Sequence, residues 1–309
     1  MAAEGGSVMI IIIRYIYRGE VGEVIPREAT HITVAEDCTF VHAEAFRGHH
    51  KIVEIICHDK VEKIEAEAFA HCSSMRRVIM PGVKIVERWA FYGCPALEDV
   101  ECGKLEIIGA SAFGGRKSLS SIDLPSVRIV ERHAFLHCRE LVNVKFGNKM
   151  ERIDREAFYN CESLKRITIP FRDGLMTTRN IIQGCSNLKR VDLVGGEIQE
   201  TIAALQLEEW RNDMNEEIDS INQILPTTHA GYYDEEEEKW ITGEKVRAIW
   251  TWMRSVVAKI MHYQVELNAY WTTPLQPHSS TFCLVILCSI MSSLYSNCHH
   301  TRSRWGINQ

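Results

Sequence analysis

The feature that most constrains this chain is an Ala-Phe pair that recurs at nearly constant spacing. Successive copies lie 22 or 23 residues apart, and Ile181-Ile182 takes the same place 24 residues after the last of them. The aromatic positions are Phe46, Phe69, Phe91, Phe113, Phe135 and Phe158. A fixed period of this length predicts a solenoid, because one short unit buries too little apolar surface to offset its conformational entropy and must stack on its neighbours.

Two apolar columns keep register with the Phe and predict two short strands in each copy. Nine residues after the Phe stand Ile55, Val78, Val100, Ile122, Val144, Ile167 and Val191. Five residues before it stand Val41, Ile64, Val86, Ile108, Val130 and Ile153. Apolar and polar residues alternate around the first column, which indicates a strand, and the second column indicates another extended segment. Between them, Ala-Phe-x-x-Cys is expected to form a tight turn.

The consensus of the copies is Ile-x-x-x-Ala-Phe-x-Gly-Cys-x-x-Leu-x-x-Ile-x-Leu-Pro, and Ile153 to Pro170 match it at nearly every position. This pattern resembles the BspA-type leucine-rich repeat and covers about half of the chain. The resemblance implies a curved parallel β solenoid that takes part in protein interaction, and it implies no catalytic residues. The longer stretch from Tyr17 to Ala269 resembles a group of uncharacterised proteins in which such repeats precede a helical tail.

We therefore predict a curved, parallel β solenoid of leucine-rich-repeat type with short turns, followed by a small α-helical C-terminal region. Residues 1–37 are expected to supply edge strands that cap the array. Residues 38–195 would hold about seven repeats of 22–24 residues. The remaining segments are predicted as a capping helix at 196–232, an acidic linker at 233–243, an amphipathic helix at 244–270, and an irregular or disordered tail at 271–309.

The two predicted helices differ in what they could contact. Apolar residues on one side of the first helix are Leu207, Trp210, Met214, Ile218, Ile221 and Leu225, and its other side is acidic. The second helix has apolar residues at steps of three and four, the pattern of a coiled-coil seam: Val246, Ile249, Met253, Val256, Ile260, Tyr263 and Leu267. This seam either packs on the first helix or pairs with a second chain, so self-association through residues 244–270 stays open at this point.

Cysteine and histidine columns accompany the repeat, and we interpret both as structural. Three residues after the Phe stand Cys72, Cys94, Cys138, Cys161 and Cys185, with His49 and Arg116 in the other two copies. Cys buries readily as a small residue, and parallel Cβ vectors suit disulfides poorly, so free thiols are expected rather than metal or redox chemistry. Two residues after the Phe, His71 and His137 alternate with Gly and Asn, which predicts left-handed turn positions. No catalytic, cofactor-binding or metal-binding residue is predicted, and no common nucleotide or hydrolase motif occurs.

Composition narrows the class of partner and the compartment. The chain has 35 basic and 41 acidic residues and a pI near 6.1, which argues against a nucleic-acid partner. Eleven cysteines, an odd number, in a long chain whose N-terminus lacks the layout of a secretory signal favour a reducing, cytoplasmic location. The apolar run Phe282 to Ile290 is too short for a spanning helix, so a membrane partner is not expected.

The outward face of the main strands is the candidate binding surface. Side chains alternate along a strand, so the residues eight and ten after the Phe should point away from the core. These positions vary between copies while the inward columns are uniform, which is typical of a recognition surface on a fixed scaffold. The acidic middle and basic C-terminal end would steer a partner of opposite polarity into register. The candidate residues are Glu54, Arg77, Asp99, Glu101, Ser121, Asp123, Asn143, Lys145, Arg166 and Arg190.

The sequence thus favours a non-enzymatic module that binds a protein partner on this face. A cell-surface adhesion protein is the first alternative, because the resemblance extends to proteins that act there. An enzyme and a membrane-tethered scaffold are more distant alternatives. The first two hypotheses differ in compartment, and hence in whether the cysteines are reduced.

The tail provides a test of the membrane expectation. The apolar stretch spans 15 residues even when counted from Thr281 to Tyr295. As an α-helix it would reach roughly 22 Å, short of the about 30 Å of a bilayer core. On cell fractionation we expect the full chain and a version ending at Tyr270 to partition alike into the soluble fraction. Detergent-dependent recovery of the full chain alone from washed membranes would contradict this expectation.

Overall fold

The computed structural model describes residues 12–20, 22–170, 175, 180–194, 202, 208–234 and 239–272. The chain forms two compact units. The first comprises Met1–Val194 and Asp219–Arg254, and the second comprises Gly195–Ile218 and Ser255–Gln309. All of the repeats lie in the first unit.

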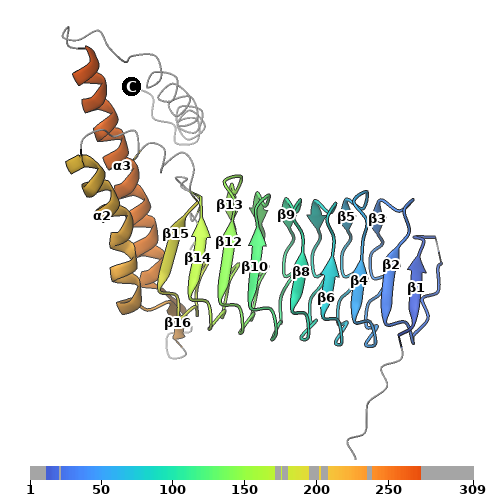
Figure 1. The fold of residues 1–309 in the computed structure, drawn as a ribbon. Coiled ribbons are helices and arrows are strands. Elements are labelled where there is room, and N and C mark those ends of the chain that lie inside the picture. The colour runs from blue at the N-terminus through green and yellow to red at the C-terminus, as the bar shows by residue number, and fades with distance from the viewer. Residues whose placement is uncertain are drawn as a thin grey trace, which may run out of the picture. The chain divides into compact units, whose positions relative to one another are not determined.

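Each turn of the solenoid contributes one strand to its main face, and Figure 1 shows these strands side by side in chain order. All paired neighbours are parallel and in register, but β8 and β10 are not paired, so the face consists of a five-stranded and a four-stranded sheet. Because β1 and β2 precede residue 38, the face begins before the first Ala-Phe copy. The strands are β1 (Arg14–Tyr17), β2 (His31–Val34), β4 (Glu54–Ile56), β6 (Arg77–Ile79), β8 (Asp99–Glu101), β10 (Ser121–Leu124), β12 (Asn143–Phe146), β14 (Arg166–Ile169) and β15 (Arg190–Leu193).

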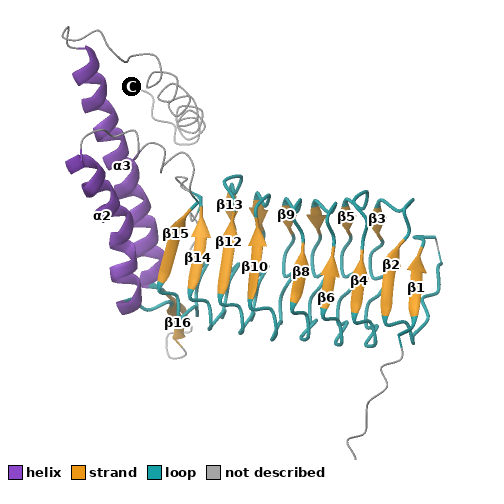
Figure 2. Ribbon diagram, in the orientation of Figure 1, coloured by secondary structure: helices purple, strands orange, loops and turns teal. Residues whose placement is uncertain are grey.

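The second predicted strand of each copy forms a six-stranded parallel sheet, here called the second sheet (Figure 2). Each of these strands has two residues, of which the second is buried and belongs to the column five before the Phe. The predicted parallel β solenoid is therefore confirmed. The strands are β3 (Phe40–Val41), β5 (Lys63–Ile64), β7 (Ile85–Val86), β9 (Ile107–Ile108), β11 (Ile129–Val130) and β13 (Arg152–Ile153).

The Phe column forms a continuous stack through the core. All six rings are fully buried. Consecutive ring centroids lie 4.9 to 5.6 Å apart, with interplanar angles of 4° to 13°. Tyr17 extends the stack at its N-terminal end, with its ring centroid 5.0 Å from that of Phe46. The stacked rings thus provide a continuous aromatic contact from one turn to the next.

The turn around each Phe is held by backbone hydrogen bonds to the following turn. In one copy, the N–H groups of Glu67, Phe69 and His71 donate to the next turn at 3.1, 2.8 and 2.8 Å. The φ angles of His71 and His137 are 62° and 56°, which confirms the predicted left-handed positions. A second left-handed column, two residues before the Phe, was not predicted. It contains no glycine and has φ angles of 55° to 71° at Glu44, Glu67, Trp89, Ser111, His133, Glu156 and Asn180.

Helical segments satisfy polar groups at the C-terminal edge of the solenoid. These belong to α2 (Glu208–Ile224), which is followed by the short 3-10 helix η1 (Leu225–Thr227), and to α3 (Glu244–Thr272). Asn222 accepts a hydrogen bond from the Val191 N–H of the edge strand at 2.9 Å. Lys245 is 1% exposed and donates to the carbonyl groups of Leu188, at 2.9 Å, and Leu225. Burying an ammonium group is costly unless it finds such acceptors, so Lys245 fixes the start of α3 against the last turn.

Within the second unit, the two helices pack on one another. The rings of Trp210 and Tyr263 stack at 5.2 Å, and the Lys259 ammonium lies 3.2 Å from Asp213 and 3.0 Å from Glu217. The predicted seam residues of the second helix from Val246 to Tyr263 are at most 8% exposed. These residues of the seam are buried within the single chain, and the side chain of Leu267, the last of the seam, lies outside the described residues.

Residues 233–243 were expected to form a solvated linker, and this expectation is wrong for most of the segment. Strands β16 (Gly231–Asp234) and β17 (Lys239–Thr242) pair antiparallel, with Tyr232 opposite Ile241 and Tyr233 opposite Trp240. Aromatic and β-branched residues favour strands, and they flank the acidic run on both sides. Residues 235–238, which carry most of the acidic run, lie outside the described residues.

Truncating one ring of the Phe stack tests the inward assignment. Phe69→Ala should lower the free energy of unfolding by about 3–5 kcal/mol, because it removes buried apolar surface and leaves a cavity. Asp123→Ala on the outward face is the control and should cost less than about 0.5 kcal/mol. Urea denaturation measures both, and equal losses would refute the assignment of inward and outward columns.

Candidate partner-binding face

Nine of the ten candidate residues are exposed, and the tenth, Glu54, is half-buried. They project from β4, β6, β8, β10, β12, β14 and β15, while the residue between each outward pair faces the core. Direct pairing aligns Glu54, Arg77 and Asp99 across the first sheet. It aligns Ser121, Asn143, Arg166 and Arg190 across the second part of the face. The structure thus brings the candidates together in two groups, which meet at the unpaired boundary between β8 and β10.

Ion pairs link the charged residues of the face along both groups. The Arg77 guanidinium lies 3.1 Å from Asp99 and also contacts Glu101. At the other end of the face one carboxylate contacts two arginines. Asp192 pairs with Arg190 at 2.8 Å and with Arg166. The hydrogen bond that Arg77 donates to Glu101 raises the pKa of Arg77. Each end of the face is therefore partly neutralised by its own neighbours.

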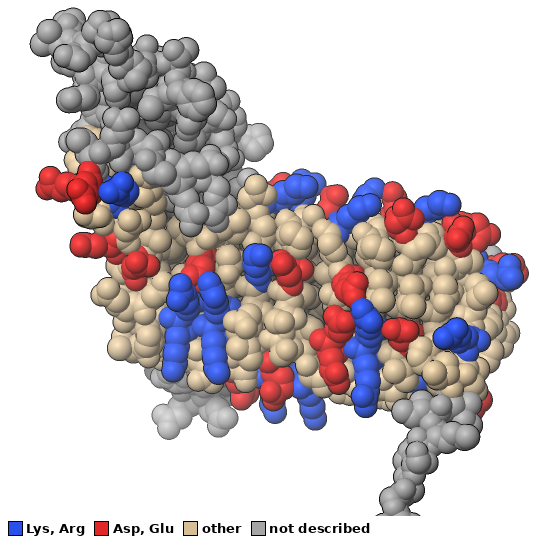
Figure 3. Space-filling model, in the orientation of Figure 1, with Lys and Arg blue, Asp and Glu red and all other residues tan. Residues whose placement is uncertain are grey.

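A charge separation remains after this pairing. Around Arg77 lie the carboxylates of Asp99 and Glu101, and Asp123 adds a third that faces Lys145 at 3.5 Å. At the other end Asp192 faces two arginines. Figure 3 shows the corresponding red-rich region over β8 and blue columns over β14 and β15. Exposed ion pairs contribute little stability, so a partner can replace them at small cost.

The face extends further toward the N-terminus than was predicted. β1 and β2 align Arg14 and His31 with the row of Glu54, and Ile16 and Thr33 with the row of Ile56. Ile16 is 55% exposed and Ile56 is 37% exposed, so the row that contains them presents apolar side chains at this end of the face. The alternation of polar and apolar residues in His31-Ile32-Thr33-Val34 is typical of a strand. These residues precede Ala45-Phe46, the first Ala-Phe pair, from which the outward positions were counted.

The second sheet also presents an outward row. Ile85, Ile107 and Ile129 stand side by side in it, and each is half-exposed. Charged side chains border this row, including Arg128, which pairs with Glu151 at 2.8 Å. These three residues are identical, whereas the outward residues of the main face differ from turn to turn. The row therefore offers fewer features by which one partner could be distinguished from another.

The cysteine column lies inside the solenoid, away from either face. All five thiols are fully buried and free. Each donates to the carbonyl of the Phe in the preceding turn at 3.0 to 3.1 Å. Burial raises the pKa of the Cys72 thiol and raises that of Cys94 to about 11. Within the described part of the chain, no group of three or more His, Cys, Asp or Glu residues is placed to hold a metal ion.

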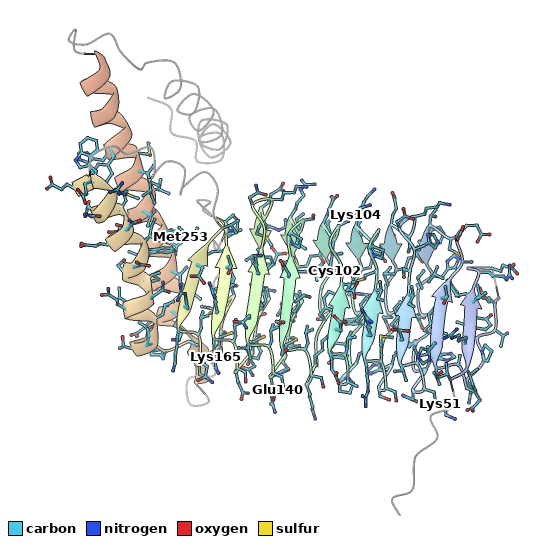
Figure 4. All side chains as sticks on the ribbon, in the orientation of Figure 1. Lys51, Cys102, Lys104, Glu140, Lys165 and Met253 are labelled. Atoms are coloured by element: carbon cyan, nitrogen blue, oxygen red, sulfur yellow. The ribbon has the colours of Figure 1, made fainter. Side chains whose placement is uncertain are left out.

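Among the described helices, none is both long enough and apolar enough to cross a bilayer. The apolar run Phe282 to Ile290 and the tail that contains it lie outside the described residues. Figure 4 shows the described side chains, including Lys165, which directly precedes β14, and Cys102, which directly follows β8.

The sequence matches the family model described as "BspA type Leucine rich repeat region". The model fits in six copies over residues 27–127 and 106–204. A comparison of the sequence with curated proteins found no match.

Several solved structures resemble the solenoid. The T. pallidum leucine-rich repeat protein TpLRR is 17% identical, covers 64% of this chain and 85% of its own, and aligns with a TM-score of 0.36. The pneumococcal vaccine antigen PcpA is 17% identical, with 59% of this chain and 66% of its own covered and a TM-score of 0.34. A Bacteroides ovatus leucine-rich repeat protein is 20% identical, with coverages of 54% and 61% and a TM-score of 0.31.

The burial of the thiol column can be tested by alkylation. At pH 8, iodoacetamide should leave the five column cysteines unmodified in the folded protein, because the reagent cannot reach the buried thiols. All five should react in urea without a reductant, as mass spectrometry of the peptides would report. Ser121→Cys, on the outward face, is the matched control and should react within minutes in the folded state. Fast native labelling of a column cysteine, or no labelling in urea, would contradict burial as free thiols.

Proposed function

Because the chain belongs to the BspA-type leucine-rich repeat family, we propose that it is a non-enzymatic interaction module, which binds a protein partner on the outward face of its main sheet. The backbone and the inward columns form a scaffold, and the outward residues are free to vary. The acidic and basic side chains on this face form ion pairs with one another across neighbouring strands. Such groups are suited to recognition rather than to proton transfer.

The observation that carries this proposal is the sorting of charge along the face. An excess of carboxylate surrounds Arg77, and an excess of guanidinium surrounds Asp192. A merely solvated surface has no reason to separate the two signs over successive turns. Strand pairing also fixes the spacing of the rows, so a partner meets a pattern rather than a diffuse charge.

The partner inferred from this pattern is a protein with three features in line. Apolar side chains would meet Ile16 and Ile56, basic groups would meet the carboxylates near Asp99, and acidic groups would meet Arg166 and Arg190. Charge complementarity of this kind increases the rate of association and rejects partners of the wrong polarity. An excess of acidic over basic residues in the chain agrees with a protein rather than a nucleic-acid partner.

We place this activity in a reducing compartment, most simply the cytoplasm. The support is the column of five free thiols, which an oxidising compartment would expose to pairing during synthesis. Adhesion at a cell surface is the competing proposal, and it requires that these cysteines survive secretion unpaired. Fractionation of cells that express the full chain distinguishes the two.

Charge reversal at the basic end tests the proposed face. The full chain is used to capture partners at low salt, and the dissociation constant of the identified protein is then measured. The double variant Arg166→Glu with Arg190→Glu should weaken binding at least about tenfold, because both charges meet like charges on the partner. Wild-type binding should also weaken as ionic strength rises.

The control is Arg128→Glu on the second sheet. Arg128 is exposed and ion-paired like the two face residues, with Glu151 at 2.8 Å and Glu106 at 3.9 Å. We expect this variant to bind like the wild type. Loss of binding in Arg128→Glu together with normal binding in the double variant would move the site to the second sheet and refute the proposal.

A further inference from the structure

Arg116 occupies the cysteine column in the copy that begins with Phe113. Its side chain is fully buried, and none of its three guanidinium nitrogens has a hydrogen-bond partner in the described part of the chain. The guanidinium carbon lies 4.3 Å from the ring centroid of Phe113 and 5.9 Å from that of Phe91. Arginine is far larger than the cysteine of five other copies, so this turn must hold extra volume in a closely packed core.

The hydrogen bonds of the main face are interrupted at the same turn. Between the other successive strands, the residue before each strand donates to the preceding turn. Glu98, for example, donates to the Arg76 carbonyl at 2.9 Å, and Val142 donates to the Ser120 carbonyl at 2.7 Å. The equivalent bond from the Ser120 N–H to the turn of β8 is absent, and β8 and β10 are not paired.

The strands on the two sides of this boundary also differ from one another. β4, β6 and β8 have three residues each, whereas β10, β12, β14 and β15 have four. Ion pairs join β6 to β8 through Arg77 and β10 to β12 through Lys145, but none among the described residues joins β8 to β10. The buried residue eleven after the Phe is small or flexible before the boundary and larger beyond it: Cys57, Met80 and Cys102, then Leu124, Phe146 and Ile169.

The same two turns remain joined on their other sides. At the corner that contains the Phe column, the Phe91 N–H donates to the Ala112 carbonyl at 2.9 Å. In the second sheet, Ile107 pairs directly with Ile129. The interruption is therefore confined to the main face. Two turns joined along two sides and unjoined along the third can rotate about the joined sides.

The packing of the core is less tight at this boundary than elsewhere. The Phe113 ring centroid lies 5.5 and 5.6 Å from those of its two neighbours, whereas the other pairs of rings are separated by 4.9 to 5.1 Å. Val100 of β8 is half-exposed, although the other residues of its column are buried. The side chains here thus leave more freedom for a change of angle than those of any other turn in the Phe stack.

We propose that the boundary between β8 and β10 is a hinge, at which the five-stranded and four-stranded parts of the main face rotate relative to one another about the paired second sheet. Arg116 keeps the two parts unpaired, because its volume forces the turns apart in the core. Motion at a hinge is taken up by a few residues while the flanking structure stays rigid. The carboxylates near Asp99 and the guanidinium of Arg190 lie on opposite sides of the hinge, so its rotation changes their separation.

Distances between spin labels on the full chain test this hinge without any partner, and hence independently of the proposed function. Nitroxides are attached through p-acetylphenylalanine, which leaves the native thiols untouched. One pair replaces Ile56 and Asn143, on β4 and β12, and spans the boundary; a second pair replaces Ile16 and Glu101, on β1 and β8, and does not. Each pair is separated by four strand spacings, or about 19 Å. Double electron–electron resonance should give a distance distribution at least about twice as wide for the first pair as for the second.

Two variants assign the motion to Arg116. Arg116→Cys carries the residue of five other copies and should narrow the first distribution to the width of the second. Arg139→Gln, which removes an exposed guanidinium from the next turn, should leave it wide. Equal widths for the two pairs in the wild type would overturn the proposal, as would an Arg116→Cys variant whose first distribution stays wide. If that variant does not fold, the wild-type comparison decides by itself.

Discussion

The hydrogen bond from one turn to the next is the interaction on which the rest of this structure depends. No strand has a partner within its own turn, because every paired neighbour in the main face and in the second sheet comes from an adjacent turn. The strand residues of an interior turn are therefore hydrogen-bonded to two other turns, while bonds within the turn, such as that from the Ala68 N–H to the Glu65 carbonyl, form its corners. The ends cannot be satisfied in this way, and the chain closes the C-terminal end with Asn222 and Lys245.

This arrangement gives the inward and outward positions of each copy different roles. The Phe, Cys and aliphatic columns face the inside of every turn and must fit the same space, so their residue types repeat. The outward positions contact only neighbours on the face, which explains why arginine, serine and aspartate can occupy one row. Arg116 is the charged exception, a buried arginine in a column where five copies have Cys and the first has His49. The unpaired boundary in the main face lies at that same turn.

Much of the fold could be predicted because the copies of the repeat can be aligned with one another, and the positions that keep one residue type then stand out. The strands, the buried Phe and Cys columns and the left-handed positions of His71 and His137 all follow from residue types at fixed spacing. The second left-handed column could not be found in this way. Glu67 and Trp89 do not favour positive φ, and bonds to the next turn impose their conformation.

The candidate face was predicted in outline but not in its details. Alternation along a strand was enough to identify the outward residues. Pairing of Arg77 with two carboxylates depends on side-chain conformations across three turns, which spacing alone does not specify. The interruption at β8 had a visible signal, the Arg in a column of thiols, but its effect on strand pairing required the structure. The β16–β17 hairpin was missed because it lies outside the repeat.

The side chains that close the last turn also determine how this array can change length during evolution. Asn222 and Lys245 recognise one particular edge, the N–H of Val191 and the carbonyl of Leu188. A turn added after β15 would separate the helices from the edge they fit, and would leave its own edge uncovered. A turn duplicated in the interior of the array lies between two other repeat turns, so both of its edges can still form the usual hydrogen bonds. Relatives with longer or shorter arrays should therefore differ by whole copies gained or lost in the middle, while the terminal copy and its helices are inherited together.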